Sequence, residues 1–193
     1  KDLDEQGLKF PEVKEPEPIT YHFDEKTDAV FYNTLEIIIN NFKYSRYTPL
    51  LYYTGIITHP EEIAQTNMRR FMKILLLKRL ESSFFAFKKS INRFIHSYTR
   101  FIDEYYNGNI FVSAKHMNKI FEYIDNDNTE AIEELLEYKK ATKYSSKDFS
   151  PKLITDLQHD LSLLKHIENM WQNVSHDPKL DKFKEILTSD NIL

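Results

Sequence analysis

Apolar residues recur every three or four positions along most of the chain, which is the spacing of one face of an α-helix. The first such stretch follows Asp24, a residue type that often caps the start of a helix. Its inward positions are Val30, Leu35, Ile38 and Phe42. We therefore expect a helix that begins at about residue 24 and ends near Asn40–Asn41.

The residues on either side of this helix have less regular patterns. Residues 1–18 carry three prolines among alternating acids and indicate an extended linker. Residues 18–23, PITYHF, alternate apolar and polar positions and predict a short strand. Residues 43–58 are rich in aromatic side chains but contain Pro49 and Gly55, so we expect a partly irregular segment.

One long helix is expected from about residue 60 to residue 106. Thr58 can cap its start, Glu61 can complete a capping box, and no Pro or Gly occurs between Pro60 and Gly108. Such a helix would be about 70 Å long, so its length allows a kink or a break near residue 67 or 97. Its apolar stripe comprises Leu76, Leu80, Phe84, Phe87, Ile91, Ile95 and Ile102.

The second half of the chain predicts further helices. They are expected at 114–124 after Ser113, at 131–141, at 152–174 after Ser150–Pro151, and at 178–187 after Asp177–Pro178. In the last of them Leu180, Phe183 and Leu187 should face inward. The pattern as a whole predicts an all-α fold, a bundle of long helices with a short extended N-terminal lead-in. We expect a lead-in at 1–23, a helical domain at 24–175 and a departing helix at 176–193.

Composition excludes several classes of protein. The chain has three glycines, which leaves few positions for tight turns. It has no cysteine, so disulfides and cysteine metal sites are ruled out, and it has no apolar run long enough to span a bilayer. We expect no membrane contact and a cytoplasmic location. Because the chain opens with Lys1 rather than Met, we expect it to be a piece of a longer protein.

Positive charge is concentrated in one segment of a chain whose formal net charge is −4. Residues 69–100 contain nine Lys or Arg against the single acid Glu81, a net charge of +8. Two interpretations stay open: a solvated face paired with acids such as those at 132–137, or a track that contacts the phosphates of a polyanion. We expect Glu81 to pair with Lys78 or another basic neighbour.

The order of residues in this segment is more specific than its charge. Residues 75–94, LLLKRLESSFFAFKKSINRF, resemble the helical region between the two RecA-like ATPase lobes of Swi/Snf-type superfamily-2 helicases, the bacterial kind that often carries a phospholipase-D-like domain. Residues 9–38 resemble the exit from the first lobe, and residues 177–187 resemble the helix that leads into the second lobe. The middle, about 97–170, resembles nothing in this family.

The resemblance implies a linker or insertion region in a parent ATP-dependent helicase or translocase. This chain has no phosphate loop, no Asp-Glu-x-His box and no arginine finger, so ATP and Mg²⁺ are expected only for the parent, and no catalytic or metal-binding residue is expected here. The implied partners are nucleic acid, with DNA favoured over RNA, and the flanking ATPase lobes.

The resemblance also carries over particular residues. Lys78, Arg79, Ser82 and Ser83 match its sharpest element, and two roles stay open for them: contact with phosphate, or attachment of the helix to one lobe so that closure of the lobes is transmitted. The charge pattern alone adds further nucleic-acid-binding candidates, Arg69, Arg70, Lys73, Lys88, Lys89 and Arg93.

Other candidate sites are weaker. Asp125, Asp127 and Thr129 have the spacing of a calcium loop, but Glu130 replaces the glycine that the loop needs and Leu136 replaces its bidentate glutamate, so we expect a helix cap instead.

His159 and His166 share one helix face but supply at most half a metal site, and we expect a surface or interfacial pair. We also expect Trp171 in the core, and Tyr105 and Tyr106 in loop packing rather than base stacking. Two rival functions stay open. The first is a free-standing helical protein-interaction domain that docks its basic helix on an acidic partner. The second, a small helical nuclease or toxin, ranks last because no paired His and acid supports it.

Overall fold

In this computed structural model the chain is described at residues 15, 16, 18–112 and 142–189. The helices expected at 114–124 and 131–141, the calcium-like loop and the acids at 132–137 all lie outside the described residues, as does most of the linker at 1–18.

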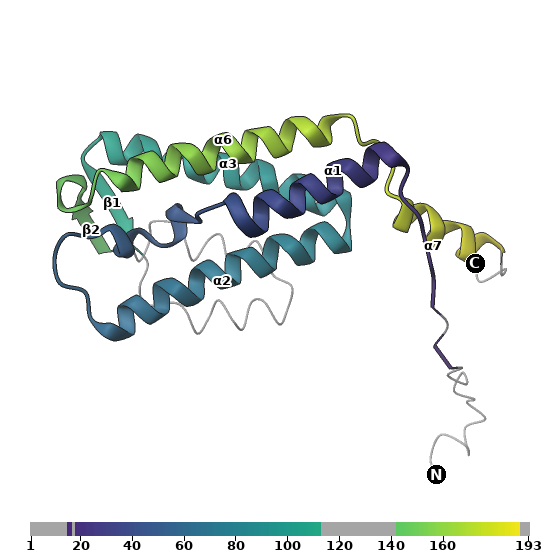
Figure 1. The fold of residues 1–193 in the computed structure, drawn as a ribbon, viewed down its shortest axis with the longest axis horizontal. Helices are drawn as coiled ribbons and strands as arrows, with labels where there is room; N and C mark the ends of the chain where they lie inside the picture. The colour runs from purple at the N-terminus through teal and green to yellow at the C-terminus, as the bar shows by residue number, and fades with distance from the viewer. Residues whose placement is uncertain (1–14, 17, 113–141, 190–193) are drawn as a thin grey trace, which may run out of the picture.

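Four helices lie side by side along the length of the molecule (Figure 1). They are α1 (Glu25–Glu36), α2 (His59–Ser82), α3 (Phe84–Tyr106) and α6 (Lys152–Gln172). A fifth, α7 (Pro178–Ser189), lies beyond one end of this bundle, on the side where the N-terminal lead-in also leaves it. The mostly helical architecture confirms the all-α prediction.

Helix α1 begins where the sequence predicts. The Asp24 carboxylate accepts hydrogen bonds from the Thr27 amide at 2.9 Å and the Thr27 hydroxyl at 2.8 Å. This cap also lowers the pKa of Asp24, because the amide and hydroxyl of Thr27 favour its ionised form. The helix continues into a π-helical turn, Ile37–Asn41, and ends there as expected.

The lead-in differs from the prediction. Residues 18–23 form no strand, because no described strand lies alongside to accept a ladder. Instead the rings of Tyr21 and Phe23 contact each other, with centroids 5.8 Å apart, and Phe23 also contacts Phe31 of α1 at 5.1 Å. The alternating apolar residues therefore pack as aromatic contacts on the end of the bundle rather than as a sheet.

The expected single long helix is two helices, and the predicted break near 67 or 97 is wrong. Thr58 and Glu61 form the predicted capping box, with the Glu61 carboxylate accepting from the Thr58 amide at 2.8 Å. The helix then ends at Ser82, and Ser83 has an extended backbone at φ −161° and ψ 131°. Helix α3 starts immediately afterwards and returns antiparallel to α2 (Figure 1).

The segment between α1 and α2 is irregular, as expected. It contains the 3₁₀ turns η2 (Ser45–Tyr47) and η3 (Pro49–Tyr52), and a third turn, η5 (Ser146–Asp148), precedes α6. Tyr44 adopts a left-handed backbone with φ 60°. Such a conformation is uncommon for a residue with a large side chain, so the surrounding contacts must hold it in place.

A small sheet lies at the end of the bundle opposite Ser83. Strands β1 (Asn109–Val112) and β2 (Thr142–Ser145) pair antiparallel, with Ile110 opposite Tyr144. Neither strand was predicted from the sequence, because four-residue strands joined across a long stretch of chain leave only a weak local pattern.

The core is formed mainly between α3 and α6. Trp171 is 1% exposed, and its ring lies against Phe84 and Phe87 at centroid distances of 4.7 and 5.3 Å. Its indole Nε1 donates to the hydroxyl of Thr34 on α1 at 2.8 Å. Trp171 is thus a core residue, as predicted, and it links three helices.

A buried carboxylate fixes the irregular segment to α6. Asp160 is 0% exposed, and it accepts hydrogen bonds from the Lys43 amide at 2.7 Å and from the amide and hydroxyl of Ser45 at 2.9 and 2.7 Å. The Tyr98 hydroxyl of α3 adds a fourth at 3.1 Å. Burial raises the pKa of Asp160, and these four hydrogen bonds oppose the rise.

Candidate functional site

The candidate site is the corner where α2 ends and α3 begins. Ser83 is the N-cap of α3, and its Oγ accepts from the Ala86 amide at 3.4 Å. A second cap comes from the far end of the chain: the Asp177 carboxylate accepts from the Phe84 amide at 2.9 Å. Helix starts leave amides without partners, so two acceptors at one start stabilise the break.

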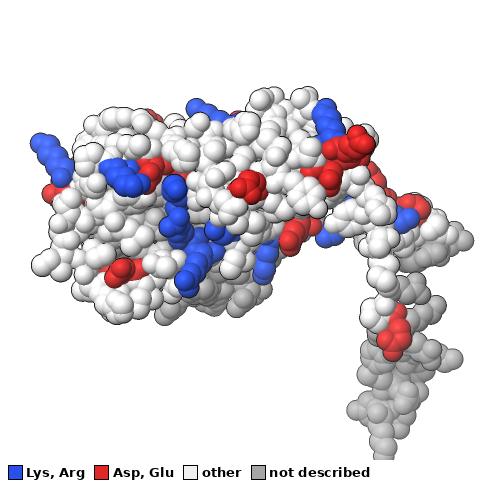
Figure 2. Space-filling view, in the orientation of Figure 1, with Lys and Arg blue, Asp and Glu red and all other residues white. Residues whose placement is uncertain are grey.

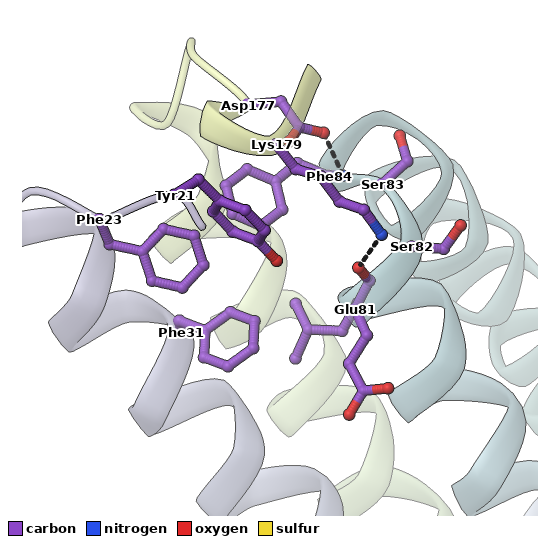
Figure 3. Close-up of a pocket in the computed structure, with 10 residues that line it drawn as sticks. Tyr21, Phe23, Phe31, Glu81, Ser82, Ser83, Phe84, Asp177 and Lys179 are labelled. Carbon is purple, nitrogen blue, oxygen red and sulfur yellow. Dashed lines mark hydrogen bonds between the residues drawn. The ribbon is translucent and has the colours of Figure 1, made fainter. Parts of the chain in front are cut away.

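The same aspartate also begins the last helix. The other oxygen of Asp177, Oδ1, accepts from the Leu180 amide at 3.4 Å, in the first turn of α7. The Lys179 ammonium donates to the backbone carbonyl of Glu81 at 3.3 Å. Two residues at the start of α7 therefore attach it to the corner (Figure 3).

The N-terminal lead-in packs on the other side of this corner. Phe23 contacts Phe84 with ring centroids 5.7 Å apart. An open pocket of about 250 Å³ lies between the lead-in and the corner. Tyr21, Phe23 and Phe31 line one side of it, and the α2–α3 corner lines the other (Figure 3). The chain thus enters and leaves the bundle at one place.

That place contains most of the element that carries the helicase resemblance. Of residues 78–83, Leu80 to Ser83 line the pocket. Ser83 acts as a cap and Ser82 is exposed. Glu81 is also exposed, and it forms no ion pair with Lys78, so the expected pairing with that residue is wrong. The reason is that Lys78 and Glu81 are both solvated on α2, where an i,i+3 contact contributes little.

Two of the predicted phosphate-binding lysines have partners inside the fold. The Lys73 ammonium donates to the Ile39 carbonyl at 2.7 Å, within the π-helical turn Ile37–Asn41. The Lys88 ammonium donates to the carbonyl of Val174, just after α6 ends. In both cases a cation lies at the carbonyl end of a helix, where the helix dipole favours it.

The other predicted basic residues fall into two groups. Arg79, Lys89 and Arg93 are each engaged in an interaction of their own. Arg69, Arg70 and Lys78 are exposed and make no hydrogen bond or ion pair with a described residue.

These cations do not share one face. At about 100° per residue, Lys78 lies roughly 180° around α2 from Arg69, so α2 alone cannot present all of them to one ligand. The apolar stripe, by contrast, is confirmed as core-facing. Leu76 and Leu80 before the break at Ser83, and Phe84, Phe87 and Ile91 after it, are all buried.

Sequence reasoning missed several residues of this corner. It placed Asp177 at the start of the last helix but not at the start of α3, and it did not single out Tyr21, Phe23 or Lys179. One local signal was present, because the pair Ser82–Ser83 is a frequent helix start. The prediction that Leu180 and Phe183 face inward is wrong: they are 48% and 54% exposed, because α7 lies outside the bundle.

The structure adds no support for a metal site, or for base stacking by Tyr106, among the residues it describes. Across the described ranges no cluster of three or more His, Cys, Asp or Glu could hold a metal ion. His159 and His166 are exposed on α6. The Tyr106 hydroxyl accepts from the Gln158 amide at 2.9 Å. No helix within the described ranges has the length and apolar character needed to cross a membrane.

Comparison with known proteins identifies no relative. The chain matches no protein-family model, no curated protein and no solved structure. Its function must therefore be inferred from the geometry of the corner and the distribution of charge.

Proposed function

We propose that this chain is the helical region between two ATPase lobes of a Swi/Snf-like superfamily-2 helicase or translocase. In this proposal the region transmits the relative motion of the lobes and adds contacts to the nucleic-acid backbone, with DNA favoured over RNA. ATP and Mg²⁺ belong to the parent's lobes, and the parent works in the cytoplasm.

One observation carries the coupling role. The lead-in, which the resemblance assigns to the first lobe, and α7, which it assigns to the second, both contact residues 81–84. A movement of either arm acts directly on this corner, because Phe84 contacts Phe23 through its ring and Asp177 through its amide. Of the two roles open for residues 78–83, attachment thus has the stronger support.

The nucleic-acid role rests on the exposed residues of α2. Arg69, Arg70, Lys78 and Ser82 are exposed, and the three cations carry no partner among the described residues. Lys73, Lys88 and Ser83 use their polar groups within the fold. Because the exposed Arg69, Arg70 and Lys78 all belong to α2, backbone contacts would come mainly from α2 rather than from α3.

The test uses the chain joined to its flanking lobes. We expect nucleic acid to stimulate ATP hydrolysis, and Asp177→Ala to reduce that stimulation while the basal rate stays unchanged. The matched control is Asp148→Ala, since Asp148 is an exposed aspartate whose carboxylate makes no hydrogen bond with a described residue. A parent without nucleic-acid-stimulated hydrolysis, or equal effects of the two variants, would remove the proposal.

The rival function is a free-standing helical domain that binds another protein. The exposed apolar side chains of Leu180 and Phe183 on α7 favour it, because a partner surface would cover them. Under this alternative an acidic protein binds the basic helix in a salt-sensitive way, and nucleic acid has no effect on that binding.

A further inference from the structure

A line of positive charge follows the boundary between α2 and the segment after α1. The Gln65 side chain of α2 accepts from the Leu50 amide at 3.2 Å, and the Lys73 ammonium donates to the Ile39 carbonyl at 2.7 Å. The flank of α2 that carries Gln65 and Lys73 therefore faces residues 37–52. Arg69 lies one turn before Lys73 on the same flank, because residues four apart are neighbours on a helix.

Two further cations extend this line. Arg70 follows Arg69 and lies about 100° further around α2, toward solvent. Lys43 lies on the other side of the boundary: Asp160 holds its backbone amide at 2.7 Å, while its side chain is exposed. We call Lys43, Arg69, Arg70 and Lys73 the basic seam.

The charges of Lys43 and Arg69 both act on one partly buried hydrogen-bonded pair, Tyr52 and Asp156. The Tyr52 hydroxyl donates to Asp156 at 2.8 Å. Burial acts to raise the pKa of Asp156, but hydrogen bonds from Lys152 and Tyr52 and the charges of Lys152 and, to a smaller extent, Lys43 lower it overall. Burial raises the pKa of Tyr52, as does Asp156, and the charge of Arg69 opposes that rise. Lys43 and Arg69 belong to the two segments that the Gln65 and Lys73 hydrogen bonds bring together.

The carboxylates near the seam are already occupied. The Glu36 carboxylate accepts from the Asn40 amide at 2.9 Å, and Asp156 and Asp160 are buried with their own donors. Within the described ranges none of the four seam residues forms an ion pair. Figure 2 shows the result: Lys and Arg side chains gather on this face over the middle of α2 and the segment after α1.

We propose that the basic seam is a binding site for the phosphate backbone of nucleic acid. The choice of nucleic acid as the ligand rests on the proposed function. The seam adds Lys43, which lies outside the basic segment at 69–100. The two guanidinium groups and the Lys43 ammonium are exposed donors, and the Lys73 ammonium, which holds the Ile39 carbonyl, adds positive charge beside them. An Arg guanidinium can donate two hydrogen bonds to the oxygens of one phosphate. Contacts of this kind are independent of base sequence, as a translocating motor requires.

The position of the seam sets it apart from the other basic residues. Lys78 lies on the opposite side of α2 from Arg69, and Lys88 caps the end of α6. The seam, by contrast, brings together cations from two separate segments along one boundary, and Lys43, Arg69 and Arg70 among them are exposed. We therefore expect Lys43 and Arg69 to act together, and Lys78 to contribute little.

The experiment measures binding of a fluorescent DNA duplex and a fluorescent single strand to the 193-residue chain by anisotropy, across a salt series. The seam variant is Lys43→Glu with Arg69→Glu, which leaves the Lys73 hydrogen bond intact. The control of equal charge change is Lys147→Glu with Lys165→Glu, two exposed lysines elsewhere on the fold. A third comparison, between Arg70→Glu alone and Arg70→Glu with Lys78→Glu, measures what Lys78, on the opposite side of α2 from Arg69, contributes to binding.

We expect salt-dependent binding of the unaltered chain, with a slope of log K against log salt of about −3 for a seam of three to four phosphate contacts. The seam variant should bind about tenfold or more weakly and lose about two units of slope, while the Lys147 and Lys165 control changes affinity by less than about threefold. Adding Lys78→Glu to Arg70→Glu should change little. Thermal unfolding shows whether each variant is folded, and Lys43→Gln with Arg69→Gln replaces the seam variant if it is not.

Three results would overturn the seam. They are no binding at low salt, an equal loss in the Lys147 and Lys165 control, and binding of poly-glutamate in place of either oligonucleotide, which would assign the seam to an acidic protein. None of these bears on the coupling role, which the Asp177 experiment tests through ATP hydrolysis. Conversely, if the parent shows no nucleic-acid-stimulated ATP hydrolysis, the proposed function fails, but the affinities measured for the seam variants still stand.

Discussion

The Asp177 carboxylate accepts a hydrogen bond from the backbone amide of Phe84, 93 residues earlier in the chain. With its second oxygen it accepts from Leu180, so one side chain caps the starts of two helices, α3 and α7. The direction of α7 is consequently linked to the corner that ends α2. Several measurable consequences depend on this shared cap and on three buried side chains, Thr34, Asp160 and Tyr98.

Replacing Asp177 with alanine should destabilise the chain and loosen α7. Loss of an N-cap typically costs about 1 kcal/mol, and here two helix starts lose one, so we expect about 1–2 kcal/mol by chemical denaturation. Hydrogen exchange of the Phe84 and Leu180 amides should accelerate together. Asp148→Ala should change neither stability nor exchange at these amides, and a loss confined to Leu180 would contradict the shared cap.

Replacing Thr34 with valine should leave the Trp171 indole N–H buried without its acceptor. We expect a cost of about 1–3 kcal/mol, because a buried donor without a partner bears its full desolvation penalty. Trp171 is the only tryptophan in the chain, so its fluorescence reports the change directly. Thr99→Val is the matched control: both hydroxyls donate to the carbonyl four residues earlier, but Thr99 is exposed. Equal losses in the two variants would show that the indole contact is unimportant.

Asp160 should make stability depend on acid pH in an unusual direction. Burial raises its pKa in the folded state, so between the unfolded value of about 4 and the folded value the folded chain binds the proton more tightly. The contribution of this group is therefore greatest at low pH and declines as pH rises through the folded pKa. Asp160→Asn removes the titration, and its deficit relative to the unaltered chain should be larger at pH 4 than at pH 7. An equal or larger deficit at pH 7 would refute this direction.

Tyr98 should make the fold sensitive to alkali. Burial raises its pKa well above the ordinary value, and the charge of Asp160 adds to the rise. Above pH of about 10 the unfolded chain loses this proton while the folded chain keeps it, so stability falls as pH rises. Tyr98→Phe costs a hydrogen bond but removes this dependence. We expect the stability difference between the two proteins to narrow from pH 9 to pH 11, as measured by denaturant unfolding; a constant difference would argue against it.

Local signals account for what the sequence predicted well. Asp24 and the pair Thr58–Glu61 cap their helices through neighbours three residues away. These helix starts can therefore be predicted from a few consecutive residues. The periodic apolar residues of α3 likewise identify its buried face. Partners far apart in the chain explain the failures. At the break after Ser83 the Phe84 amide has its acceptor in Asp177, and the strand β1 needs β2.

The candidate site was only partly predictable for the same reason. Lys73 and Lys88 look like free cations in the sequence, yet each donates to a carbonyl at the end of a distant helix. Lys43 lies outside the basic segment and reaches the seam only because Asp160 holds its backbone amide. The family resemblance pointed to residues 78–83, but only the folded chain shows the lead-in and α7 meeting there.

The shared cap has a practical consequence for anyone who shortens this chain. A version trimmed after Gln172, the last residue of α6, would look complete as a bundle. It would nevertheless lack the acceptor of the Phe84 amide, and it would also lack the Val174 carbonyl to which Lys88 donates. Retaining residues up to 180 keeps both contacts, so the minimal stable unit extends past the last bundle helix into the first turn of α7.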